Sequence, residues 1–496
     1  MEMGNRTPAY HKQGIDINKL LLIGLASLMV HSCRTGSFGS VKTNDEIIEI
    51  GLKEKQLTFD RKGHFLNQRQ VFSPDDVHVV FDNRNDDGKI GENGSIQRLN
   101  IENGKIETIY SYDQQSKYGP GMGAVSYHPK MEEVVFIHGL KDASRENPYD
   151  FTRRFAMKVQ INKAGDHVFR PMESRDVKFP YTKGALRGGS HAYSYSPDGK
   201  WVSFTYNDDI LRREEETNHD IADLRTVGAL WIGDSVDIKG KQNEKNFKGE
   251  RVAFILARVT KDPQPGSSEI MKAYEECWIP QGRDSLGPNS NIPYALAYLG
   301  DIINKKMERS TEVFISQLPP QVNQMITSTD AGTEFLLPSV PAGVTQKRLT
   351  FTQNRKYPGV QGPRQWLRSS PDGKAVYFCM QDNQGEVQIY KVAPDSGEIG
   401  QVTNNSFSLD TSFSLSSDGN YLAYGYEEGI FITDVSNGKT HRVLSDSEDS
   451  SNIGLSNINW SNNGYQIVYN RKVLNEAGRF YQIFLLDLSK LIKKQY

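Results

Sequence analysis

The chain has 496 residues, a formal net charge of −2 and 10% aromatic residues. A chain of this length can bury a large core, and length alone suggests about two to four domains. The near-neutral charge and the lack of a basic stripe exclude nucleic acid as an expected partner. The aromatic content, together with scattered glycine and proline, indicates a β-rich globular protein and not a disordered one.

The N-terminus predicts a targeting segment. The apolar run Leu20–Val30 is too short to span a bilayer and is typical of a signal peptide. The "VHSC" that ends it resembles a bacterial lipoprotein signal over residues 1–32, with Cys33 lipidated, although His31 is unusual in such a box. An ordinary signal peptide with an incidental cysteine is the alternative. Residues 33–52 predict a flexible tether. We therefore expect an exported lipoprotein, facing the periplasm or cell surface, whose lipid anchor is its only membrane contact.

A short turn of the Ser-Pro-Asp-Gly kind recurs along the rest of the chain. Proline, aspartate and glycine suit the successive backbone conformations of a tight hairpin turn. The first turn residues are Ser73, His128, Ser196, Ser370, Ser417 and Ser461. A strand of alternating apolar residues follows each turn, and a second hairpin such as "VQIYKVAPDSGEIGQVT" usually follows that strand. Repeated units of four strands predict an all-β fold, a β-propeller of four-stranded blades.

The spacing of the turns predicts seven blades, with six or eight as alternatives. The long gap between Ser196 and Ser370 must contain a further blade, and "YALAYLGDI", "TEVFISQLP" and "KRLTFTQ" fit its last three strands. Residues 208–281 then hold an insertion together with the rest of blade three. "KQLTFDRKG" at Lys55 resembles an outer strand but precedes the first blade. We expect it to complete the last blade, which closes residues 53–496 into a single propeller domain and removes a free sheet edge.

Several segments resemble known families. The "SPDG" units resemble the TolB-like, PD40-type propeller repeats. "LRGGSHAYSYSPDGKWVSFTYND", "DPQPGSSEIMKAYEECW" and "RLTFTQNRKYPG" together resemble the YidR-like family of uncharacterised bacterial propellers, over roughly residues 55–496. This resemblance implies the fold and supplies no reaction. The chain departs from the family mainly at its N-terminus and in "NRNDDGKIGENG" (Asn83–Gly94).

The propeller geometry predicts a polar site at one mouth of the central channel. The residues five positions before each turn should meet there: Gln68, Gly123, His191, Gln365, Ser412 and Ser456. The candidate ligand-binding residues at this level are His191, Arg187, Arg364 and Trp366, with Asn207 and Asp208 from a loop and Tyr274 and Glu275 from the insertion. Arginine suits carboxylate or phosphate, and tryptophan suits stacking, so the pattern favours an anionic or sugar-like ligand. A solvated mouth whose arginines and aspartates only tie blades together is the alternative.

His191 is the candidate catalytic residue, as a base, but such a role needs partners that spacing alone does not place. Metal-dependent oligogalacturonate lyases are also seven-bladed propellers and have a histidine-rich channel. Here one ring position in six is histidine, which argues against that chemistry. Asn83–Gly94 resembles a calcium loop but has Gly94 where a glutamate is needed, so we interpret it as a polar turn. We expect no cofactor, with calcium or another divalent metal left open.

Two functional hypotheses result. The first is a ligand-binding or interaction module of the cell envelope, for a small molecule, a glycan or an envelope protein. The second is a lyase or hydrolase acting on an acidic oligosaccharide, with His191 as base and Arg187 or Arg364 holding the acidic group. Cys277 and Cys379 lie beside apolar residues, which favours two buried thiols over a disulfide.

Overall fold

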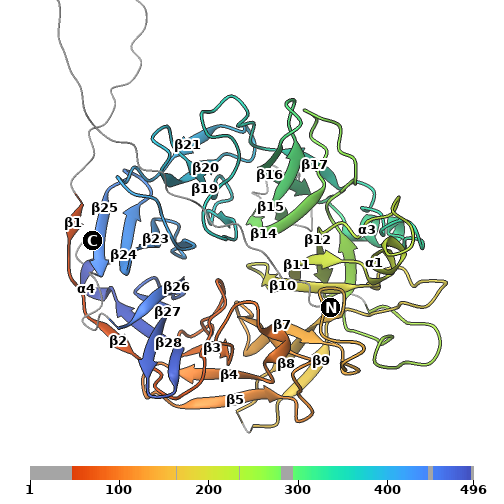
Figure 1. Cartoon of the computed structure of the whole chain (residues 1–496), viewed down its shortest axis with the longest axis horizontal. Helices are drawn as coiled ribbons and strands as arrows, with labels where there is room; N and C mark the ends of the chain where they lie inside the picture. The colour runs from red at the N-terminus through yellow and green to blue at the C-terminus, as the bar shows by residue number, and fades with distance from the viewer. Residues whose placement is uncertain (1–46, 164, 234, 281–293, 445–450, 493–496) are drawn as a thin grey trace, which may run out of the picture. The chain divides into compact units, whose positions relative to one another are not determined.

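The computed structural model describes residues 47–163, 165–233, 235–280, 294–444 and 451–492. The predicted signal peptide, Cys33 and most of the tether lie outside these residues. Seven β-sheets are arranged around a central axis as the blades of a propeller (Figure 1), which confirms the predicted fold class and blade number. No helix among the described residues is long and apolar enough to cross a membrane.

Each blade is a meander of strands that runs outward from the axis. Blade one contains β3 (His78–Asp82), β4 (Ser95–Asn100) and β5 (Ile106–Ser111), and its inner segment pairs with β3 through two bridges at Phe65 and Phe72. Blade two contains β6 (Met122–Tyr127), β7 (Glu133–Gly139), β8 (Arg154–Gln160) and β9 (Val168–Pro171). Blade three contains β10 (Gly189–Tyr195), β11 (Trp201–Asn207), β12 (Thr226–Trp231) and β13 (Val252–Ile255).

The remaining blades follow the same plan. Blade four contains β14 (Lys272–Pro280), β15 (Tyr294–Ile303), β16 (Arg309–Gln317) and β17 (Thr345–Arg348). Blade five contains β18 (Arg368–Ser369), β19 (Val376–Gln381), β20 (Val387–Val392) and β21 (Ile399–Gln401). Blade six contains β22 (Ser414–Leu415), β23 (Tyr421–Tyr426), β24 (Gly429–Asp434) and β25 (Thr440–Leu444). Blade seven contains β26 (Ile453–Trp460), β27 (Gln466–Asn475) and β28 (Gly478–Asp487).

The range 208–281 contains three blade strands, joined by longer connecting segments. β12 and β13 complete blade three, and β14, which carries Tyr274 and Glu275, is the inner strand of blade four. β14 was hidden from the repeat pattern because no Ser-Pro-Asp-Gly turn follows it. The short helices outside the sheets are η1 (Ile90–Glu92), α1 (Asp209–Glu215), α3 (Val322–Ser328) and α4 (Ser489–Ile492).

The recurring turns are built as their residues predict. In the turn of blade three, Ser196 Oγ donates to Asp198 Oδ1 at 2.6 Å, and Trp201 N donates back to Ser196 Oγ at 3.1 Å. Gly199 then adopts a φ of +79°, a conformation that costs a residue without a side chain little. In blade six the turn serine is Ser416, which bonds Asp418 at 2.6 Å, one residue earlier than the predicted Ser417.

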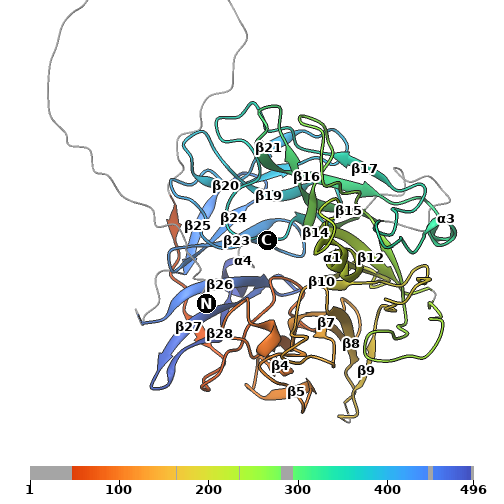
Figure 2. The same cartoon turned by 45° about the vertical axis from the view of Figure 1, so that its right-hand side comes forward.

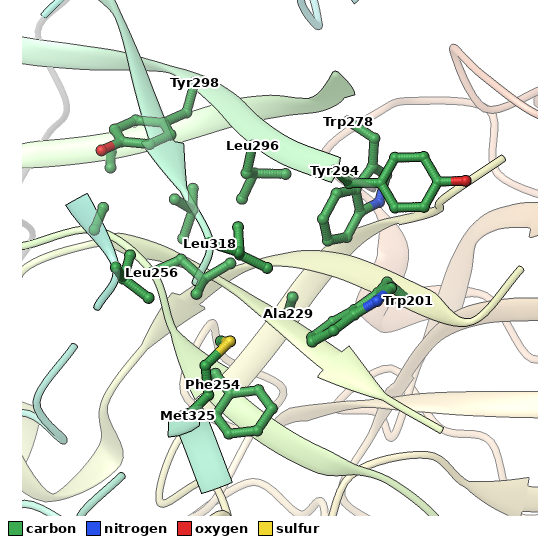
Figure 3. Close-up of a cluster of buried hydrophobic side chains, with 14 of the residues drawn as sticks. Trp201, Ala229, Phe254, Leu256, Trp278, Tyr294, Leu296, Tyr298, Leu318 and Met325 are labelled. Atoms are coloured by element: carbon green, nitrogen blue, oxygen red, sulfur yellow. The ribbon is translucent and has the colours of Figure 1, made fainter. Parts of the chain in front are cut away.

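Apolar side chains fill the spaces between neighbouring blades. The cluster between blades three and four holds Trp201, Phe254, Trp278 and Leu296 (Figure 3), and the two tryptophan rings lie 6.2 Å apart. Trp278 Nε1 donates to the carbonyl of Ser194 at 2.9 Å, so the buried polar end of the ring is satisfied. Cys277 and Cys379 are buried as free thiols, as the sequence favours.

The N-terminal segment closes the ring. β2 (Glu54–Gln56) pairs antiparallel with β28 and supplies the missing outer strand of blade seven, as predicted from the sequence. Just before it, β1 (Ile48–Glu49) runs parallel to β25 along the rim of blade six (Figures 1 and 2). The closure is reinforced by Arg471, which is fully buried and donates to Glu54 at 2.9 Å and to Glu428 at 2.6 Å.

Candidate functional site at the channel mouth

Bulges in the inner strands shape one mouth of the channel. The residues with a positive φ in these strands or segments are Gln70, Ala124, Ala192, Glu275 and Asn457, with values between +53° and +64°. The pairing register breaks around four of them. A bulge interrupts the alternation of a strand and redirects the neighbouring side chains, and this backbone conformation is unfavourable for residues other than glycine. A feature that recurs in five blades therefore marks this level of the channel as a shaped site.

A cavity of about 190 Å³ lies at this level, and we call it the mouth cavity. Blades one, two, three, five and seven contribute to its wall. The polar, charged and aromatic residues of its lining include Gln68, Arg84, Asp87, Phe151, Arg154, His191, Arg225, Arg364 and Trp366. Three of the eight predicted ligand-binding residues, His191, Arg364 and Trp366, are among them.

Two arginines meet around an aromatic ring on one side of the mouth cavity. The guanidinium carbons of Arg154 and Arg225 lie 4.4 Å and 5.1 Å from the ring centre of Phe151, which is 48% exposed. Neither arginine forms an ion pair within the part of the chain that the structure describes. Burial lowers the pKa of both, and Arg154 lowers the pKa of Arg225 further by charge repulsion. This wall of the cavity carries positive charge that no carboxylate neutralises directly.

A second arginine–aromatic group lies on the other side. Trp366 has the guanidinium carbon of Arg69 at 5.1 Å from its ring centre and that of Arg364 at 4.7 Å. Arg364 donates to Asp87 at 2.5 Å and lies 3.5 Å from a carboxylate oxygen of Glu275. Because Asp87 belongs to blade one and Arg364 to the entry of blade five, this contact crosses the mouth.

His191 lies within this positive environment. Its side chain is buried, its ring centre is 6.0 Å from that of Phe151, and its Nδ1 has no hydrogen-bond partner. Burial lowers the pKa of His191 well below its usual value, and Arg154, Arg225 and Arg364 lower it further. The imidazole is therefore neutral at neutral pH. Gln68 Oε1 and Trp366 Nε1 are also buried without partners, so residues of the cavity wall hold an unused donor and unused acceptors.

Glu275 is an unusual carboxyl at the edge of this group. Its φ of +56° lies at the bulge of β14. Burial raises its pKa to about 7, against the opposing effect of Arg364. The carboxyl therefore changes charge near neutral pH beside an arginine of the mouth cavity.

Arg187 and Asp208 belong to the scaffold and not to the cavity wall. Both are fully buried and form an ion pair at 2.8 Å. Arg187 also donates to the carbonyls of Thr333 at 2.5 Å and Leu336 at 3.0 Å, while Asp208 caps the N-terminus of α1. These two predicted ligand-binding residues are therefore engaged in internal contacts and do not line the mouth cavity.

Asn207 and Tyr274 lie behind the site. Asn207 Oδ1 accepts from Arg225 Nε at 3.0 Å, which fixes the position of that arginine. Tyr274 does not line the cavity, and its hydroxyl donates to Asp301 at 2.9 Å. The pairing register of β14 breaks directly after Tyr274, at the bulge that contains Glu275.

Sequence reasoning missed Phe151, Arg154, Arg225 and Asp87. Phe151 and Arg154 precede or begin the third strand of blade two, and Arg225 precedes the third strand of blade three. A signal was present, because Phe151 and Arg154 stand together in the aromatic and arginine-rich segment "YDFTRR" (residues 149–154). Across residues 47–492, with the gaps given above, no three His, Cys, Asp or Glu side chains gather as a metal site would require.

The loop Asn83–Gly94 is more than a polar turn. It leads from β3 to β4, and its residues Asp87, Gly88 and Ile90 line the mouth cavity. Its first half is held by Arg84, whose guanidinium is buried against Asp82 with an Nε–Oδ1 distance of 2.7 Å. The loop therefore extends inward over the channel from blade one.

The chain is similar to several known proteins. It is 35% identical over 405 residues to the uncharacterised protein YidR of Escherichia coli (strain K12), which covers 80% of this chain and 91% of YidR. Residues 121–247 match a family described as a protein of unknown function, DUF3748. An oligogalacturonate lyase in complex with manganese is 10% identical, with a TM-score of 0.50 over 89% of this chain and 98% of the lyase. TolB from Acinetobacter baumannii is 13% identical, with a TM-score of 0.36 over 74% of this chain and 62% of TolB. At 10% identity the likeness to the lyase concerns the fold alone.

Proposed function

We propose that this chain, which belongs to the YidR family, binds a small hydroxylated anion, such as a sugar acid or sugar phosphate, in the mouth cavity. The observation that carries the proposal is the pair Arg154 and Arg225, which face the cavity without an ion-pair partner among the described residues. Their mutual repulsion is unfavourable, and a bound carboxylate or phosphate relieves it. Guanidinium groups suit such anions because they offer several donors in a fixed plane.

The unused polar atoms of the wall narrow the ligand class. Trp366 Nε1 is a donor only, whereas Gln68 Oε1 is an acceptor only. A ligand that satisfies both must accept and donate hydrogen bonds, as hydroxyl groups do. The ring of Phe151 is half exposed at the entrance and offers an apolar face to a sugar ring.

Isothermal titration calorimetry with glucuronate and glucose tests this proposal, because the two sugars differ in one carboxylate. We expect glucuronate to bind and glucose to bind at least about tenfold more weakly, since a hydrogen bond to a charged group is worth roughly 1.5–3 kcal/mol. Arg154→Gln and Arg225→Gln should each weaken glucuronate binding by about tenfold. Arg212→Gln, on the exposed face of α1, is the matched control and should bind as the wild type does. Equal binding of the two sugars, or wild-type affinity in both arginine variants, would refute the anion site.

We also propose that the protein acts at the cell envelope through a lipid on Cys33. The support is the sequence alone, an apolar run followed by "VHSC". Fractionation of cells that make the wild type and Cys33→Ser tests it. We expect the wild type in the membrane fraction and the variant outside it, and the same distribution for both would contradict a lipid anchor.

A second candidate function is catalysis at the same site. His191 favours it, because a neutral imidazole with an unpartnered Nδ1 is available to accept a proton. If His191 is a general base for cleavage of an acidic oligosaccharide, His191→Ala should abolish turnover of oligogalacturonate while glucuronate binding and the melting temperature change little. A large loss of thermal stability would instead identify His191 as a scaffold residue.

A further inference from the structure

The loop Asn83–Gly94 is fixed at both ends by residues of other blades, and its centre carries Asp87. Near its start, Asn85 Nδ2 donates to the carbonyl of Arg479 at 2.7 Å, and Tyr481 N donates to Asn85 Oδ1 at 2.8 Å. Near its end, Asn93 Nδ2 donates to the carbonyl of Met122 at 2.8 Å. Blades two and seven therefore hold the two ends, and Arg84 holds the main chain of Asp87 between them.

The centre of the loop places a carboxylate at the mouth cavity. Asp87 accepts from Arg364 Nη1 at 2.5 Å and lies 3.3 Å from Arg84 Nη1. Asp87 and Arg364 both line the mouth cavity. A carboxylate held against an arginine of the site occupies the kind of position that the anionic group of a ligand requires.

We propose that Asp87 is an internal competitor for the ligand's anionic group, occupying Arg364 in the free protein and leaving it when the ligand binds. This inference rests on the proposed function. Asp87 is the acidic counterpart of the positive cavity, so its removal strengthens binding, whereas removal of an arginine weakens it.

The ion pair between Asp87 and Arg364 is weak enough for a ligand to replace it. Both side chains of the Asp87–Arg364 pair are 52% exposed, and exposed ion pairs contribute little to stability. Arg364 keeps Trp366 and Glu275 as neighbours after Asp87 leaves, so its guanidinium stays at the cavity. The loop itself remains attached, because Arg84 Nη1 donates to the main-chain carbonyl of Asp87 at 2.7 Å.

Calorimetric titration of the full-length protein with glucuronate tests the inference. Asp87→Asn should bind glucuronate about three- to fivefold more tightly than the wild type, which corresponds to the strength of an exposed ion pair. The matched control is Glu92→Gln, which removes the same charge from the same loop but only breaks an ion pair with Lys89. It should bind as the wild type does. In an Arg364→Gln background, adding Asp87→Asn should give no gain.

The outcomes separate this inference from the function on which it rests. Glucuronate binding with equal affinity in Asp87→Asn and Glu92→Gln overturns the competitor role and leaves the anion site standing. If Asp87→Asn still tightens glucuronate binding in the Arg364→Gln background, the gain comes from the lower negative charge of the loop, and the competitor role is again overturned. Absence of glucuronate binding in every variant overturns the proposed function together with this inference.

Discussion

The affinity of the mouth cavity for an anion should fall as the pH rises through 7, because of Glu275. Its carboxyl lies 3.5 Å from Arg364, and burial raises its pKa to about 7. Below pH 7 the protonated carboxyl leaves Arg364 free for the ligand. Above pH 7 the carboxylate competes for Arg364 and repels the bound anion. The same linkage requires that a bound anion raise the pKa of Glu275 further.

The size of the effect follows from the geometry. An anion bound to Arg364 would lie roughly 7 Å from the Glu275 carboxylate, where two unit charges at an effective dielectric constant of 20 repel by about 2 kcal/mol. Arg364 is half exposed, so solvent screening reduces this to about 1 kcal/mol, or about fivefold in Kd. Lys272, Arg69 and Arg225 also face Glu275, and they are the same in the wild type and in Glu275→Gln, so comparing the two proteins isolates the effect of Glu275.

The assay is the Kd of glucuronate measured between pH 5.5 and 8.5, where the sugar carboxylate stays ionised. We expect a step of about fivefold centred near pH 7 in the wild type and a flat profile near pH 7 in Glu275→Gln. Burial raises the pKa of Asp223 to about 6, and this carboxyl lies near Arg225, so its titration needs a separate control. Asp223→Asn should keep the step at pH 7. A wild-type affinity independent of pH, or a step that survives in Glu275→Gln, would refute the reasoning.

Three further predictions concern the scaffold. Glu173 is fully buried and burial raises its pKa to about 7, so its ionisation lowers the stability of the protein as the pH rises. Glu173→Gln should therefore stabilise the protein by about 2–3 kcal/mol at pH 8.5 and much less at pH 5. Urea unfolding measures the difference, and a difference independent of pH would contradict this prediction. Arg471→Met removes the buried cation that Glu54 and Glu428 share, and it should cost about 3 kcal/mol. The loss should appear as a lower Tm and faster proteolysis near the N-terminus, and an unchanged Tm would argue against the closing role. Arg187→Ala should lower the Tm, because it breaks the ion pair with Asp208. It should leave glucuronate binding unchanged at temperatures where the protein is folded. An unchanged Tm with weaker glucuronate binding would instead indicate that Arg187 contacts the ligand.

The fold was predictable because its signals are local. The residues that determine the geometry of the turn at Ser196 lie within five positions of one another, and repetition of that turn along the chain identifies the blades. The closing strand at Lys55 was also predictable, because it resembles an outer strand that has no blade of its own. Blade four was only partly visible, since its inner strand β14 lacks the turn that marks the others.

The site was less predictable because its signals are contacts between distant residues. His191, Arg364 and Trp366 were placed at the mouth by counting from the turns, which is a local argument. Whether an arginine is free or paired depends on the partner that the fold brings to it. Arg187 meets Asp208 in the interior, whereas Arg154 meets Phe151 at the cavity, and nothing in the local sequence separates the two cases.

The closure of the ring also constrains how the protein is made. The side chains of Glu54 and Arg471 meet although they are 417 residues apart along the chain. A ribosome therefore synthesises nearly the whole chain before β2 has a partner, and one of the first strands made is among the last to pair. Pairing over such sequence separations is slow. Until the final residues emerge, the nascent chain is an open arc with two unpaired edges, and it needs protection from aggregation for that whole interval.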